Sequence, residues 1–241
     1  MLKLSPPDTY WKKEVTLFLN KRLALLIKML YPFAIMVPAA ATGIPTQYAA
    51  AVVGIVVVMA GTFGAGETLT ADLNDGILAR LALTPVSPHR LVFEILIVNA
   101  VLDFIQLLPA VIVVLVIMGS PLSWGAVAVF AIFFALLTAN AIGVLIANFT
   151  SSPADVLLYA TIVLFPLIYL SGFFRSQQLT GILGFFRGFV PFSYMNDALK
   201  AAFGLTVHTS PLMVLACLPT ICTVLAVVVT LMGPRLLTQR V

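Results

Sequence analysis

The sequence predicts an all-α membrane protein with six transmembrane helices. Only 13 basic and 9 acidic residues stand among 241, and apolar runs of about 20 residues recur along the chain. A helix rises 1.5 Å per residue, so ~20 apolar residues cross the ~30 Å hydrocarbon layer. A transmembrane barrel would instead need strands of ~10 residues with alternating polarity. The six runs cover 23–42, 48–66, 95–118, 124–147, 155–174 and 211–232.

The residues before the first run, 1–22, predict an amphipathic helix lying on the membrane surface. Trp11, Val15 and Phe18 share one face at helical spacing, and lysines occupy the opposite side. Two alternatives stay open for this region. It is a solvated basic leader, or it forms a cleaved signal peptide together with the first apolar run.

Basic residues orient the predicted spans. Of the 13 Lys and Arg residues, all but three lie in residues 1–28, in the connection between runs two and three, or in the tail after run six. The other three, Arg175, Arg187 and Lys200, follow run five. The positive-inside rule therefore places both termini in the cytoplasm and the residues after run five outside.

Two prolines shape the connection between runs two and three. A short helix over 73–83, started by Asp72, is expected to stop before Pro85, because proline disfavours helix in the preceding residue. Ser87 and Pro88 then match the cap and the first position of the next helix. Such a stiff corner could transmit a push from a cytoplasmic partner, although a simple helical hairpin fits the same residues. The corner displays Arg80, His89 and Arg90.

The third run carries an intramembrane polar stripe. Asn99, Asp103 and Gln106 lie at i, i+4 and i+7 on one helical face. A carboxylate inside a membrane indicates a proton or cation relay by default, because a charge there is costly. The alternative is a structural role, with Asp103 hydrogen-bonded to a neighbouring helix.

The connection between runs five and six predicts a pair of re-entrant helices. Its apolar part, about 179–192, is too short to cross and contains Arg187. Pro191 breaks it, Ser193 can cap a second short helix, and Gly204 can end that helix.

Motifs for bond chemistry are missing from this sequence. It contains no phosphate-binding loop, no His-Glu-x-x-His zinc motif, no Cys/His cluster and no Gly-x-Ser-x-Gly elbow. We therefore expect no enzyme activity, no metal and no cofactor in this chain. Its basic residues give no case for nucleic-acid binding. If ATP drives the protein, another chain binds it.

Four segments, in order along the chain, resemble one family. They are the leader TYWKKEVTLFLNKRL, the connection DGILARLALTPVSPHRL, the SGFFR that closes run five, and VPFSYMNDALKAAF before run six. Together with six spans, they resemble the transmembrane subunit of ABC-2 type exporters. This class includes drug and polysaccharide exporters and is similar to the membrane half of ABCG transporters.

The resemblance implies an interfacial helix over 1–22 and a transmembrane domain over 23–241, with a coupling segment at 67–90 and an outer re-entrant segment at 175–205. It implies a homodimer, or a pair with a sister permease, and two separate ATPase subunits that bind ATP and Mg²⁺. Family members often carry an Arg-Glu pair where this chain has Leu73-Asn74. The coupling motif falls on Gly76, Arg80, Leu81, Thr84, Pro85, Ser87 and Arg90, and His89 lies beside it.

The family architecture also implies an outer gate and a substrate path. The gate motif falls on Pro191, Tyr194 and Asp197. Phe165, Tyr169 and Phe173 recur every four residues and are expected on the path, although packing against helices or lipid explains the same stripe.

The expected function is ATP-driven export of a small hydrophobic or lipid-like compound across the plasma membrane. Three alternatives remain: a proton-coupled transporter that uses Asp103, a polysaccharide exporter, and a membrane scaffold without a substrate path.

Overall fold

The computed structural model describes residues 10, 11, 16, 22–77, 87–174, 181–207 and 209–232, and within them the chain forms helices and no strand. The all-α membrane class is therefore confirmed. The helices are α2 (Arg22–Ala41), α3 (Thr46–Asn74), α5 (Pro88–Ile117), α6 (Leu122–Ala147), α7 (Pro153–Leu170), α8 (Gly181–Arg187), α9 (Pro191–Ala202) and α10 (Pro211–Leu231).

In the described part of the chain, five helices are long and apolar enough to cross a membrane: α3, α5, α6, α7 and α10. The first predicted span corresponds to α2, whose apolar part, Leu26–Ala41, is shorter. A sixth crossing through α2 therefore stays a prediction.

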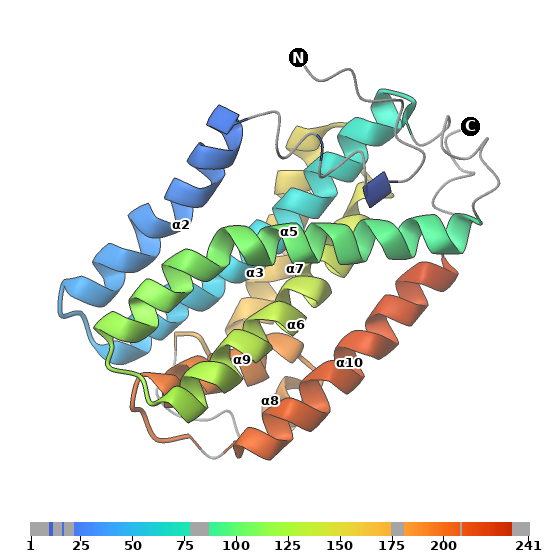
Figure 1. The fold of residues 1–241 in the computed structure, drawn as a ribbon. Helices are drawn as coiled ribbons and strands as arrows, with labels where there is room; N and C mark the ends of the chain where they lie inside the picture. Colours follow the sequence, from blue (N-terminus) through green and yellow to red (C-terminus); the bar gives the residue numbers. More distant parts are fainter. Residues whose placement is uncertain are drawn as a thin grey trace.

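The bundle is built around α6, which contacts α3, α5, α7, α9 and α10. The start of α2, the end of α3, the start of α5 and the end of α10 gather toward one end of the bundle (Figure 1). The short helices α8 and α9 lie at the opposite end. The predicted coupling and outer segments therefore belong to opposite ends of the fold.

Small residues bring α3 and α6 into close contact. A Cβ on Gly61 would lie 2.8 Å from the Ala139 methyl, and one on Gly66 would lie 3.2 Å from the carbonyl oxygen of Gly143. A Cβ on Gly143 would collide with the carbonyl oxygen of Thr62. Without these side chains the two backbones can approach closely, as in other membrane helix pairs. This contact fixes the centre of the bundle.

α3 continues further than the sequence predicts. A separate helix starting at Asp72 is wrong, because Asp72 lies inside α3 and is only 5% exposed. The side chain of Thr70 bonds that of Thr150 at 3.3 Å, and the amide of Asn74 donates to the Ser151 carbonyl at 3.0 Å. These contacts favour continuing the helix to Asn74. The chain then turns at Gly76, whose φ of +66° suits a residue without a side chain.

α5 is a single 30-residue helix that changes direction near its middle (Figure 1). Pro109 lacks the N–H that would bond to the carbonyl of Ile105, and this weakens the helix at that point. The helix begins beside the end of α10 and runs away from it, and its last part lies beside α2.

Candidate functional site

The predicted coupling residues lie at the end of the bundle where α5 begins. Arg80, Leu81, Thr84 and Pro85 fall in 78–86, outside the described residues. Ser87 caps α5 as predicted: its Oγ accepts the N–H of Arg90 at 3.4 Å, and Pro88 occupies the first helical turn. The predicted cap and first helical position, Ser87 and Pro88, are therefore confirmed, and the stiff corner, which also depends on Pro85, stays a prediction.

His89 ties the start of α5 to the end of α10. Its Nδ1 lies 2.8 Å from the carbonyl oxygen of Thr230. A carbonyl only accepts, so Nδ1 carries the proton and donates. Arg90 makes an ion pair along its own helix, with Nε 3.0 Å from Oε1 of Glu94. The start of α5 is therefore held to the end of α10 by one hydrogen bond and braced along its own helix by one ion pair.

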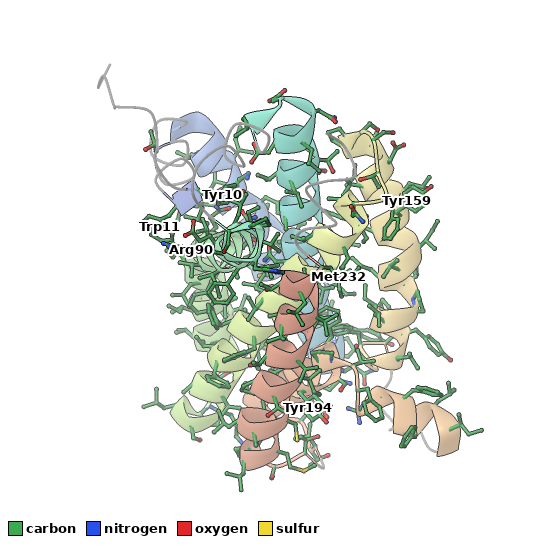
Figure 2. All side chains as sticks on the ribbon, turned by 90° about the vertical axis from the view of Figure 1, so that its right-hand side faces the viewer. Tyr10, Trp11, Arg90, Tyr159, Tyr194 and Met232 are labelled. Carbon is green, nitrogen blue, oxygen red and sulfur yellow. The ribbon has the colours of Figure 1, made fainter. Side chains whose placement is uncertain are left out.

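The leader reaches the same corner. Tyr10 is completely buried in the core, whereas Trp11 is exposed. Tyr10 and Trp11 lie beside Arg90 in Figure 2, and in Figure 1 the same short stretch of helix lies against the first half of α5. Apart from residues 10, 11 and 16, the predicted interfacial helix lies outside the described residues.

At the opposite end, α8 and α9 are joined by a buried ion pair. Arg187 ends α8, and its Nη2 lies 2.6 Å from Oδ1 and 2.7 Å from Oδ2 of Asp197 in α9. Only 16% and 8% of these two side chains are exposed. Thr209 adds a hydrogen bond of 2.5 Å to Asp197 Oδ2 from the chain leading into α10. The predicted gate residue Asp197 therefore links three segments.

Other side chains of α9 hold the neighbouring turns. The Tyr194 hydroxyl donates to the Gly188 carbonyl at 2.9 Å. Asn196 donates to the carbonyl of Ser171 at 3.0 Å, and Lys200 to that of Gly172 at 2.9 Å, where α7 ends. Burial lowers the pKa of the Lys200 ammonium, while the Asp197 carboxylate acts in the opposite direction. Pro191, the third predicted gate residue, is buried at the start of α9. Arg90 and Tyr194 stand toward opposite ends of the bundle (Figure 2).

The three aromatic residues expected on the substrate path do not share one face. Phe165 is 67% exposed and Tyr169 48% exposed, on the outside of α7. Phe173 is completely buried, and its ring fills the space beside Gly54 of α3. The spacing fails because α7 ends at Leu170 and the chain then turns at Gly172, whose φ is +73°.

The polar stripe of α5 faces two neighbours. The amide of Asn140 in α6 donates to Oδ2 of Asp103 at 3.1 Å. Asp103 and Gln106 also line a cavity between α2, α3 and α5, together with Lys28. Asn99 is buried one turn earlier and is not part of that lining. Asp103 therefore makes the bond to a neighbouring helix that the structural alternative predicts. The cavity beside it was not predicted from the sequence.

The sequence model of the ABC-2 type transporter family matches residues 9–203, which run from the leader through α9. The chain belongs to the ABC-2 type transporter family. No curated protein and no solved structure matches the chain. The matched residues include both the corner at Ser87 and the buried ion pair between Arg187 and Asp197 at the opposite end. An ABC-2 domain is the membrane component of its transporter and not the ATPase.

Sequence reasoning missed several partners within this ABC-2 domain. Lys28 was counted only among the basic residues of 1–28 that orient the chain, but it lines the cavity beside Asp103. Asn140 bonds Asp103 through its side-chain amide, and Thr230 bonds His89 through its backbone carbonyl. Both lie inside apolar runs, and nothing in the sequence pairs them with residues of α5. Arg187 did carry a signal, because a charge inside a short apolar segment calls for a buried partner.

Proposed function

We propose that this chain is the permease subunit of an ATP-driven exporter in the plasma membrane, with both termini in the cytoplasm. A separate ATPase subunit, two copies per complex, binds ATP and Mg²⁺ and docks on the coupling segment and the leader. The observation that supports this most directly is the capped start of α5 at Ser87 and Pro88, tied by His89 to α10, in a chain of the ABC-2 family.

The corner suits a mechanical input. A push on residues 67–90 reaches α5 through its capped first turn and reaches α10 through the bond from His89 to Thr230. A flexible loop would absorb the same displacement. Coupling requires that nucleotide and substrate prefer different conformations, and a corner that moves two spans together supplies such a difference.

The contacts between α8, α9 and the chain before α10 suit a gate that stays shut until the ATPase acts on the coupling segment. The ion pair between Arg187 and Asp197, with the bond from Thr209, joins α8, α9 and the start of α10. We assign this cluster to the outer gate, which the intact ion pair would hold closed. Opening it would break one buried ion pair, and the energy for that step comes from the ATPase.

The substrate we propose is a small hydrophobic or lipid-like compound. The outside of α7 presents Phe165 and Tyr169, together with apolar neighbours such as Ile162. In a homodimer, or a pair with a sister permease, two such faces would line a shared path. Aromatic and aliphatic side chains there suit an apolar molecule better than a hydrated glycan.

The experiment purifies the tagged protein from its native host in mild detergent and identifies bound proteins by mass spectrometry. The test variant is the double substitution Arg80→Glu/Arg90→Glu. The control is Lys200→Gln, which changes a cation at the opposite end. We expect an ATPase at about one copy per permease in the wild type and the control, and its loss from the double variant.

Two results would count against the proposal. If no ATPase accompanies an intact wild-type oligomer, the exporter lacks its energy source. A proton-coupled transporter that uses Asp103 would then be the better interpretation, and Asp103→Asn should abolish transport driven by a pH gradient. If the ATPase binds the double variant as well as the wild type, the coupling assignment is wrong.

A further inference from the structure

A cavity of about 330 Å³ lies between α2, α3 and α5. Most of its lining is apolar, and Ile27, Met59 and Leu107 contribute from the three helices. The polar groups that line it are Lys28 and Tyr31 from α2, and Asp103 and Gln106 from α5. Its volume is several times the ~30 Å³ of one liquid water. The space therefore suits a small polar group attached to an apolar body.

Asp103 offers one carboxylate oxygen to this cavity. Its Oδ2 accepts the Asn140 amide at 3.1 Å, which fixes the carboxylate between α5 and α6. Among the described residues, no donor is hydrogen-bonded to Oδ1. An ionised carboxylate among transmembrane helices is costly unless it has a cationic partner. The position of Oδ1 therefore favours a ligand with a positively charged donor.

Gly64 leaves the approach to this oxygen open. A Cβ at residue 64 would lie 3.6 Å from Oδ1 and 3.8 Å from Oδ2 of Asp103, with no other atom within 4 Å. Any larger side chain would occupy the space in front of the carboxylate. Gln106 is one turn further along α5, only 8% exposed, and its amide oxygen can accept a second hydrogen bond.

Lys28 and Tyr31 form the more exposed edge of the same cavity, one turn apart on α2. Both can donate to an anion, and Lys28 adds a positive charge. The cavity thus has acceptors around Asp103 and donors around Lys28. A molecule with an ammonium and an anionic group separated by a few bonds would satisfy both ends.

We propose that this cavity binds the headgroup of a zwitterionic membrane lipid with a primary ammonium, of the phosphoethanolamine type. The ammonium donates to Asp103 Oδ1 and Gln106, the phosphate accepts from Lys28 and Tyr31, and the acyl chains lie along exposed apolar residues of α2 such as Ile27. A quaternary ammonium has no N–H, so a phosphocholine headgroup leaves the acceptors unsatisfied. The site is separate from the aromatic face of α7, and binding needs neither ATP nor a partner subunit.

The experiment compares two lipids that differ only in three methyl groups. The delipidated protein in detergent is titrated with dioleoyl phosphatidylethanolamine or dioleoyl phosphatidylcholine, and bound lipid is counted by native mass spectrometry. We expect roughly tenfold or greater preference for the ethanolamine lipid, as a charge-assisted hydrogen bond to a partly buried carboxylate provides. Asp103→Asn should reduce that preference to near one.

Two further variants separate site from fold. Gly64→Leu fills the space before Asp103 while keeping the bond to Asn140, and it should also remove the preference. Glu94→Gln neutralises a carboxylate of α5 that lies outside the cavity, and this variant should keep the preference for the ethanolamine lipid. Equal binding of the two lipids by the wild type would overturn the proposal, as would a preference that survives in both Asp103→Asn and Gly64→Leu. These lipid-binding measurements do not depend on ATP-driven transport. If the proposed transport function is wrong, the expected lipid preference stays the same.

Discussion

Neutralising Arg187 tests whether the buried ion pair holds together the end of the bundle that contains α8 and α9. The guanidinium contacts both carboxylate oxygens of Asp197 at 2.6 and 2.7 Å, and less than a fifth of either side chain is exposed. Removing one member of such a pair leaves the other charge buried and unpaired, which costs ~3–5 kcal/mol. We therefore expect Arg187→Gln and Asp197→Asn each to lower the free energy of unfolding by about that amount.

The double variant Arg187→Gln/Asp197→Asn distinguishes an ion pair from two separate contributions. With both charges gone, no unpaired charge remains, so its loss should be smaller than the sum of the two single losses by at least ~2 kcal/mol. The assay is reversible unfolding of the purified protein by SDS in mixed micelles, with the helical signal in circular dichroism as the readout.

The exposed pair of α5 provides the matched control. Arg90 and Glu94 make the same kind of contact at 3.0 Å, but 67% of the Arg90 side chain is exposed. An exposed pair contributes only ~0–1 kcal/mol, so Arg90→Gln should hardly change stability. If Arg187→Gln costs no more than Arg90→Gln, the reasoning about the buried pair is refuted.

Four further predictions address other contacts. Gly143→Val places a side chain against the backbone of α3 and should abolish the monodisperse peak in size-exclusion chromatography, whereas Gly125→Val, with open space around it, should preserve that peak. His89→Ala removes the bond to α10 and should lower transport per ATP hydrolysed several-fold in proteoliposomes; unchanged coupling would show that the bond transmits nothing. Ser152→Ala removes the cap of α7 and should cost ~0.5–2 kcal/mol in SDS unfolding, and a neutral result would contradict the capping box. Because burial lowers the pKa of Lys200, the unfolded chain binds that proton more tightly, so stability should rise with pH in the alkaline range below 10.5; Lys200→Met should flatten this rise in the unfolding midpoint.

The helices could be predicted because they depend on local composition. Each predicted span overlaps a helix, and the bounds agree to within a few residues except at the end of α3 and the start of α5. α3 runs to Asn74 because its last turns bond to residues 150 and 151, which no local pattern reveals. The prediction that Phe165, Tyr169 and Phe173 share one face was wrong because the helix is shorter than expected. The chain turns at Gly172, before Phe173 can take its place on that face.

The candidate sites were predictable in part. Ser87 and Pro88 act within a few residues of each other, and the sequence contains that whole interaction. Asp103 was found because a charge inside an apolar run is rare. Its partners were not, because Lys28 and Asn140 lie far along the chain and become neighbours only when α2, α5 and α6 come together.

The close contact of α3 with α6 bears on how the protein is made. α3 presents Gly61 and Gly66 to a helix that is synthesised only after α5, and Gly143 on α6 completes the contact. Until α6 leaves the ribosome, the glycine face of α3 has no native partner in the bilayer. A chain stalled before α6 would therefore be inserted but not folded, which makes the arrival of α6 the step that commits the nascent protein to its final form.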